Sequence, residues 1–232
     1  MREQTFQRVA AVGALVGVAF AIASALLEIV AIPDATDPAS AFPAVITHGR
    51  TAGMLFHFSM VSDMLGYYLL LIPLAIFLWR WLHHQSPLLC AVSTSAGLGY
   101  CLIGAAGAVV LGAVLPALGD QYSTASAAQR EVLLTTGTAV ANAVYQGIWN
   151  TLGAITAGVW WLGTGYLLRS QRTKLGIVWM LTGAASLVDA VGFMTGVPFV
   201  GLIGLIPFIV LVPVSAAAVA VDLLRRPVRV GA

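Results

Sequence analysis

The chain has 232 residues, of which 59% are hydrophobic and 9% are charged. A soluble domain of average composition carries about 25% charged residues, so this chain has too little polar surface to cover a water-soluble globule. Its net charge of +2 gives no case for a basic face that binds nucleic acid. The composition therefore indicates an integral membrane protein.

Six apolar stretches in chain order are long enough for transmembrane helices, each of which needs roughly 20 apolar residues. They cover residues 9–32, 52–81, 88–118, 132–168, 175–197 and 199–224. We therefore expect an all-α, polytopic membrane helix bundle with six transmembrane helices in one domain over residues 1–232. The first stretch is longer than a typical signal core, so we interpret it as a retained helix. The fourth stretch exceeds the bilayer thickness, so residues 131–138 should lie at or beyond the interface.

The basic residues predict the topology. When the loops alternate sides, Arg50 and Arg130 fall on one side and the other nine fall together. Those nine are Arg2, Arg8, Arg80, Arg169, Arg172, Lys174, Arg225, Arg226 and Arg229. The positive-inside rule then predicts a multi-pass protein of the cell membrane with both termini in the cytoplasm. The acids Asp34, Asp37, Asp120 and Glu131 fall on the outer side. Two longer segments fall on the outer side, 33–50 with three prolines and 119–130. We expect both to be loops that either cap a cavity mouth or only connect helices.

Two apolar stretches each carry a carboxylate near their middle, Asp63 and Asp189. An acid at membrane depth is expensive and must face protein or a wet cavity, so each predicts a functional site. Glu28 lies near the end of the first helix, close to the helix face that carries the small residues Gly13 and Gly17. We expect that face to be interior. Counted in turns from the expected membrane edges, Asp63 lies near mid-depth, and Glu28, His57, Gln146 and Asp189 lie in the outer half. We predict one outward-opening cavity walled by the first, second, fourth and fifth helices.

Polar and aromatic side chains at helical spacing supply the other candidates. The fourth helix carries a stripe, with Asn142, Gln146 and Trp149 on one face and Tyr145 and Asn150 beside it. This stripe fits either a cavity wall or a hydrogen-bonded seam between helices, and both interpretations stay open. We predict Asp63, Asp189 and Glu28 as the acids of the site. The predicted ligand-binding residues are His57, Met60, Tyr67, Asn142, Tyr145, Gln146, Trp149, Asn150, Ser186 and Phe193. A lone histidine on an apolar face is more often a satisfied core residue than a ligand.

The sequence holds no metal-ligand spacing, P-loop, dinucleotide fingerprint, HExxH or GxSxG, so we expect no metal and no cofactor. Cys90 and Cys101 are about three helical turns apart and cannot bond to each other. No lysine or arginine is embedded beside the acids, which excludes a retinal Schiff base. Two or three carboxylates in a cavity of low dielectric cannot all stay ionised cheaply. At least one is expected to act as a general acid, a proton carrier or a counter-ion for a cationic ligand.

Four functions remain open. The first is a binding protein for a lipophilic or cationic small molecule. The second is an intramembrane enzyme of the cyclase or isomerase type that uses a buried carboxylic acid on a lipid or isoprenoid. The third is a small proton-coupled transporter, for which we expect a homodimer, because Asp63-Met64-Leu65-Gly66-Tyr67 resembles residues 189–193 in the manner of an inverted repeat. The fourth is a structural membrane subunit. In each case the expected surroundings are membrane lipids.

The layout of the whole chain is also familiar. The residues that carry the likeness are Arg-Val-Ala-Ala-Val-Gly-Ala-Leu at 8–15, Asn-Ala-Val-Tyr-Gln-Gly-Ile-Trp-Asn at 142–150 and Trp-Trp-Leu-Gly-Thr-Gly-Tyr-Leu-Leu-Arg at 160–169, with an arginine cluster at the end of the last helix. The chain resembles a large group of bacterial, often actinobacterial, six-helix membrane proteins catalogued only as a domain of unknown function. The resemblance implies the fold class and a location in the inner or plasma membrane, and it implies no reaction.

Overall fold

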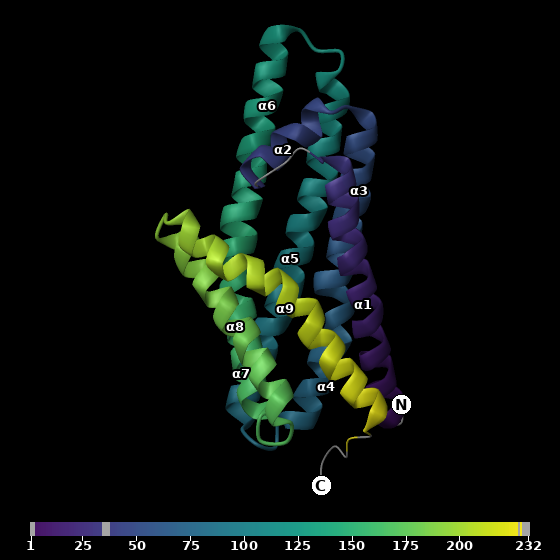
Figure 1. The fold of residues 1–232 in the computed structure, drawn as a ribbon, viewed down its shortest axis with the longest axis vertical. Helices are drawn as coiled ribbons and strands as arrows, with labels where there is room; N and C mark the ends of the chain where they lie inside the picture. The colour runs from purple at the N-terminus through teal and green to yellow at the C-terminus, as the bar shows by residue number, and fades with distance from the viewer. Residues whose placement is uncertain (1–2, 34–37, 227, 229–232) are drawn as a thin grey trace.

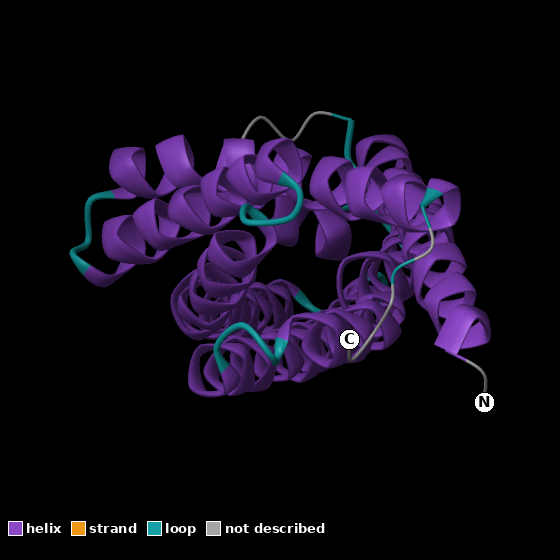
Figure 2. Ribbon diagram, turned by 90° about the horizontal axis from the view of Figure 1, so that it is seen from below, coloured by secondary structure: helices purple, strands orange, loops and turns teal. Residues whose placement is uncertain are grey.

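The computed structural model describes residues 3–33, 38–226 and 228, and over these residues the chain is helical with short connections and no strand (Figure 2). Four charged residues that the topology prediction used lie outside the described residues: Arg2, Asp34, Asp37 and Arg229. The α-helices are α1 (Glu3–Ala31), α2 (Pro38–Thr47), α3 (Arg50–Asp63), α4 (Ile72–Leu82), α5 (Pro87–Tyr122), α6 (Ala127–Asn142), α7 (Ala154–Leu168), α8 (Thr173–Met194) and α9 (Pro198–Arg225). A π-helix η1 (Met64–Tyr68) and a 3-10 turn η2 (Leu69–Leu71) join α3 to α4, and a π-helix η3 (Ala143–Gly153) joins α6 to α7.

Five helical segments within the described part of the chain are long and apolar enough to cross a membrane. They are Glu3–Ala31, Arg50–Leu82, Pro87–Tyr122, Thr173–Met194 and Pro198–Arg225. The predicted all-α class is thereby confirmed, as is the character of a helical membrane protein. The segment formed by α6, η3 and α7, which we expected to be the fourth span, is not among the five. Its polar stripe lowers its hydropathy below that of the other segments.

The outer segment between the first two spans is not simply the loop that we expected, because α2 forms ten residues of helix within it. The helix begins at Pro38, where a proline costs no hydrogen bond, but Pro43 lies inside it. Val45 and Ile46 are both fully buried, and Ile46 packs beside Gly137 of α6. The apolar burial of this face stabilises a helix that intrinsic propensity alone would not predict.

Both described ends of the chain lie at the same end of the bundle, at the bottom of Figure 1. There Gln7 is buried in α1 and donates from Nε2 to the carbonyl oxygen of Leu223, while its Oε1 accepts from the backbone N–H of Val228. From this junction α1 and α9 diverge towards the other end (Figure 1). We call the half of the bundle near this junction the termini half and the opposite half the cavity half.

The termini half is packed around three tryptophans, Trp160 and Trp161 of α7 and Trp179 of α8, each with no exposed surface. The ring centroids of Trp161 and Trp179 are 4.2 Å apart, and those of Trp160 and Trp161 are 4.8 Å apart. Offset aromatic contacts of this kind add to the free energy of burial. The cluster fixes α7 against α8 below the level of the cavity.

A close helix crossing positions the span that carries Asp63. A Cβ atom added to Gly66 in η1 would lie 2.3 Å from the backbone nitrogen of Ala21 in α1. Only glycine fits there, and the small face of α1 around Gly17 accepts the neighbouring backbone. This contact sets η1, and with it Asp63 at the end of α3, directly against α1.

Candidate functional site

A cavity of about 580 Å³ opens in the cavity half, and α1, α2, α3, η1, α5, η3, α8 and α9 all contribute to its wall. Its acidic lining residues are Glu28, Asp63 and Asp189, and its aromatic ones are Phe42, Tyr67, Tyr68, Tyr100, Tyr145, Trp149 and Phe208. No lysine, arginine or histidine of the described chain lines it. A space of this size accommodates a small molecule, and carboxylates beside aromatic faces suit a positive charge.

One wall of the cavity is formed by α1 and α3, which run antiparallel. The hydroxyl of Ser59 donates to the carbonyl oxygen of Ser24 at 3.1 Å, so these two residues face each other. Glu28 and Asp63 each lie four residues beyond this contact, in opposite directions, which separates their Cα atoms by about 12 Å along the axis. Because Cα–Cβ bonds tilt towards the N-terminus of a helix, the two side chains lean towards one another. Both side chains line the cavity.

The opposite wall is formed by α8 and η3. The hydroxyl of Ser186 donates to the carbonyl oxygen of Ala154 at 2.8 Å and fixes the register of the two antiparallel segments. Asp189 lies one turn beyond Ser186 on α8, and Asn150 lies one turn before Ala154 in η3. Because the two segments are antiparallel, both steps lead away from the termini half. Asp189 and Asn150 therefore lie at the same level, and they are only 1% and 4% exposed. Both line the cavity.

Three buried polar atoms that belong to lining residues have no hydrogen-bond partner among the described residues. They are Asp63 Oδ2, Asn150 Nδ2 and Asp189 Oδ1. Most buried polar side-chain atoms in proteins are paired, so each such orphan requires an explanation. Here all three belong to the walls of a single space.

Both π-helical segments contribute to the lining. Asp63 immediately precedes η1, which supplies Tyr67 and Tyr68, and η3 supplies Tyr145, Trp149, Asn150 and Gly153. A π-helix has a wider turn than an α-helix, so residues five apart share a face. Tyr145 and Asn150 meet that spacing. Long π-helical segments are rare and are frequent at functional sites, which makes their coincidence with this cavity informative.

Glycines of α5 make room for the aromatic lining. The indole N–H of Trp149 donates to the carbonyl oxygen of Gly104 at 3.1 Å. A Cβ atom at Gly104 would lie 1.9 Å from the ring of Tyr68, and one at Gly107 would lie 2.3 Å from Trp149 Nε1. Any larger residue at position 104 would displace Tyr68, so the shape of the cavity depends on α5 as much as on the acids.

Eight of the predicted site residues line this cavity. They are Glu28, Asp63, Asp189, Met60, Tyr67, Tyr145, Trp149 and Asn150. Two of them also contact residues that come from elsewhere in the sequence: Tyr67 donates from its hydroxyl to the carbonyl oxygen of Ile209 at 3.3 Å, and the ring of Tyr145 lies 5.8 Å from that of Phe42. These eight positions lie on the first, second, fourth and fifth of the predicted helices, and the third and sixth, which correspond to α5 and α9, also contribute lining residues.

The other five predicted residues do not line it. His57 Nδ1 lies 2.8 Å from the carbonyl oxygen of Gly112, which satisfies the ring within the bundle. Ser186 is used in the α8–α7 contact. Phe193 is in edge contact with Tyr145 at 5.5 Å, behind the lining. Asn142 precedes η3, and Gln146 lies within it and is exposed, because the wider turn of η3 breaks the 3.6-residue stripe that placed both residues beside Trp149.

Other lining residues were not predicted. Phe42 enters the cavity from α2, Tyr100 from α5 and Phe208 from α9, and Tyr68 enters from η1. The ring centroid of Tyr100 lies 5.1 Å from that of Tyr68 and 6.3 Å from that of Phe208. These three rings form the floor of the cavity. The aromatic pair at 67–68 and the small-residue face of α5 were the available signals in the sequence.

The two segments that resemble each other in sequence differ in backbone. Residues 64–68 form a π-helix after Asp63, whereas residues 190–193 after Asp189 continue a regular α-helix. Tyr67 lines the cavity and its counterpart Phe193 does not. The likeness in sequence therefore corresponds to an acid on each wall and extends no further in the local geometry.

The described residues contain no group of three or more His, Cys, Asp or Glu side chains that could hold a metal ion. Cys90 and Cys101 are both buried and unbonded to each other. The polar groups of the cavity are therefore those of three carboxyls, an asparagine, one serine and several aromatic side chains.

Comparison with known proteins identifies the family. No curated protein and no solved structure matches the chain. A family described as a domain of unknown function, DUF4386, matches residues 9–223, which include every helix that lines the cavity. The chain therefore belongs to the DUF4386 family.

Proposed function

We propose that this protein is a membrane protein of six transmembrane segments whose intramembrane cavity binds a lipophilic or cationic small molecule. The sixth segment would be α6–η3–α7. In support, η3 and α7 pack directly against α5 and α8, which are both candidate spans. A helix enclosed between two spanning helices shares their depth, and Tyr145, Trp149 and Asn150 of this segment face the cavity and not lipid.

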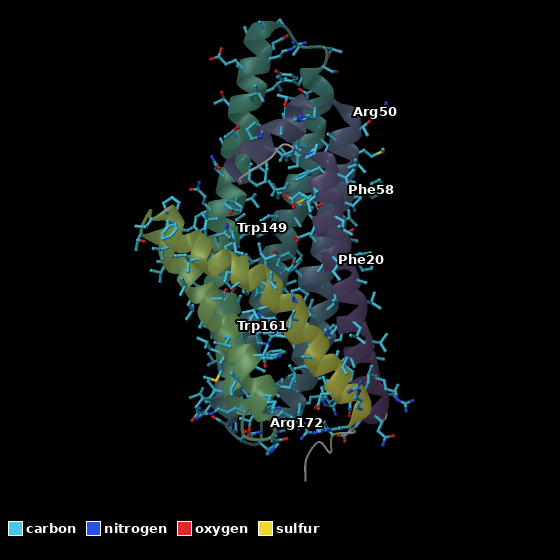
Figure 3. The ribbon with its side chains drawn as sticks, viewed as in Figure 1. Phe20, Arg50, Phe58, Trp149, Trp161 and Arg172 are labelled. Carbon is cyan, nitrogen blue, oxygen red and sulfur yellow. The ribbon has the colours of Figure 1, made fainter. Side chains whose placement is uncertain are left out.

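We further propose that the termini half lies at the cytoplasmic side and that the cavity opens outward in the cell membrane. Arg172 and Arg50 mark opposite ends of the bundle (Figure 3). Seven described basic residues belong to the end that carries the termini: Arg8, Arg80, Arg169, Arg172, Lys174, Arg225 and Arg226. The positive-inside rule assigns such an end to the cytoplasm.

The observation that carries the proposal of a ligand is that Asp63, Asn150 and Asp189 line one cavity and that each holds a buried polar atom without a partner among the described residues: Asp63 Oδ2, Asn150 Nδ2 and Asp189 Oδ1. An unsatisfied buried polar group costs about 1–3 kcal/mol, and more when it is charged. Three such groups in one cavity are tolerated most simply if a bound molecule satisfies them.

Two features favour binding over the alternatives. A carrier needs a path on both sides of its central acid, whereas the rings of Tyr68 and Tyr100 lie between the cavity and Trp160 of the tryptophan cluster. A structural subunit needs filled seams, whereas this space holds about 580 Å³. An intramembrane enzyme would use the same carboxyls and would release a product that differs from its substrate.

The experiment is mass spectrometry of small molecules extracted from the protein after purification in lipid nanodiscs. Three samples are compared: the parent, Asp63→Asn, and Glu131→Gln, which removes an exposed carboxylate outside the cavity. We expect one species to be enriched with the parent and with Glu131→Gln and to be missing from Asp63→Asn, with the same helix content in all three. Identical extracts from all three samples would contradict the proposal, and a pair of interconvertible species would favour an enzyme.

A further inference from the structure

The polar groups of the cavity are divided between two walls of different character. Glu28 and Asp63 on α1 and α3 present two carboxyls that lean towards each other, and no basic side chain of the described residues lines the cavity. Asn150 and Asp189 on η3 and α8 lie at one level of the other wall and hold an unpartnered donor and an unpartnered acceptor among the described residues. Figure 1 shows α8 on one side of the bundle and α1 with α3 on the other.

The two walls call for different ligand groups. Two facing acids without a basic partner are best satisfied by a positively charged nitrogen between them, because a charge-assisted hydrogen bond is about twice as strong as a neutral one. A donor and an acceptor on one wall that do not bond to each other are best satisfied by a group that both accepts and donates, as a hydroxyl does. The space between the walls is lined by rings, including Trp149 and Phe208, which suit an apolar or aromatic framework.

We infer that the ligand is an amphipathic organic cation that bears a second polar group: its charged nitrogen lies between Glu28 and Asp63, and its hydroxyl or amide reaches Asn150 and Asp189. This inference rests on the proposed binding function and names the ligand class for the same cavity. Asp189 and Asn150 supply independent support, because they are nearly fully buried, line the cavity and hold unpartnered atoms among the described residues.

The test uses one amino alcohol and two analogues that each lack one feature. The probe is propranolol, which carries a naphthyl ring, a hydroxyl and a secondary amine that is charged at pH 7. Its deoxy analogue lacks the hydroxyl, and its N-acetyl derivative lacks the charge. Binding is measured by equilibrium dialysis of each compound against nanodiscs of zwitterionic lipid that hold the protein, with empty nanodiscs and the Glu131→Gln variant as controls for partitioning into lipid.

We expect the parent protein to bind propranolol about tenfold or more tightly than the N-acetyl derivative and several-fold more tightly than the deoxy analogue. Asp63→Asn should abolish the preference for the amine. Asn150→Leu, which conserves volume, should abolish the preference for the hydroxyl and leave the preference for the amine.

Equal binding of propranolol and its N-acetyl derivative by the parent protein would overturn the assignment of a cation. Equal binding of the deoxy analogue would overturn the second polar group, and failure of propranolol to bind at all would overturn both. These comparisons need no variant to fold. They are also separate from the extraction experiment, since a neutral molecule found in the extract would preserve the proposed function while refuting the inference about charge.

Discussion

The termini half and the cavity half use their buried aromatic residues in opposite ways. In the termini half Trp160, Trp161 and Trp179 fill the space between α7 and α8 completely, with ring centroids 4.2 to 5.7 Å apart. In the cavity half Trp149 is held by one hydrogen bond to α5 at the edge of an open space. Figure 3 shows Trp161 and Trp149 one above the other in the same helical segment.

The difference lies in the backbone as well as in the side chains. The tryptophan cluster stands on the regular helices α7 and α8, whereas four of the cavity rings, those of Tyr67, Tyr68, Tyr145 and Trp149, stand on π-helical segments. Close packing gives stability, and departures from the regular helix aim side chains at a space that packing leaves open. From this comparison we expect the termini half to be the main source of stability and the cavity half to carry the candidate site.

Among the variants that compare the two halves, Trp160→Ala is expected to have the largest effect on the free energy of unfolding. The side chain is fully buried against two other tryptophans, so its removal should lower the free energy of unfolding by about 3–5 kcal/mol. Denaturation of the purified protein in bicelles measures it. A loss of stability within about 1 kcal/mol would show that the termini half is not the main source of stability.

Gly104→Ala should have a smaller effect on folding and a decisive one on the site. The new Cβ would lie 1.9 Å from the Tyr68 ring, so the ring must move into the cavity. We expect a loss of about 1–3 kcal/mol in stability and of most ligand binding. Gly99→Ala on the same helix is the matched control, because its Cβ would meet only Thr156 at 3.8 Å. Equal behaviour of the two variants would refute the role of α5 in shaping the cavity.

Trp149→Phe and Trp161→Phe compare the halves at one side chain each. The first change removes the hydrogen bond from Trp149 to Gly104, worth about 0.5–1.5 kcal/mol, and we expect it to weaken ligand binding several-fold. The second removes an indole N–H that has no partner among the described residues, and we expect ligand binding to be unchanged. Titration of both variants with one ligand checks this, and a larger effect of Trp161→Phe would reverse the assignment of the halves.

The smallest effect is expected at the polar edge of the termini half. Arg172 Nε lies 2.9 Å from Asp222 Oδ2, and both side chains are partly exposed. Arg172→Gln should therefore cost no more than about 1 kcal/mol, and less at high salt, without any change in ligand binding. Unfolding measured at two salt concentrations tests it. A loss of binding would mean that the two halves are coupled.

The sequence was sufficient for the features that depend on composition and on single residues. Apolar length predicted the five helical segments that are long and apolar enough to cross a membrane. The cost of burying a carboxylate singled out Asp63 and Asp189, which the structure brings to the same cavity. Features that depend on backbone geometry could not be predicted. A fixed 3.6-residue period assigned Asn142 and Gln146 to the site, and η3 does not follow that period. The helix α2 forms because its face is buried by distant residues, and no local pattern indicates that burial.

The central claim is that the unpartnered polar atoms of the two cavity walls are satisfied by a bound small molecule. The most direct measurement is an experimental density map of the protein purified in native lipid, at a resolution that separates ligand from side chains. The account predicts non-protein density that reaches Asp63 Oδ2 on one wall and Asp189 Oδ1 on the other. Side chains collapsed into the space, with Asp63 and Asp189 each bonded to neighbouring protein groups, would contradict it.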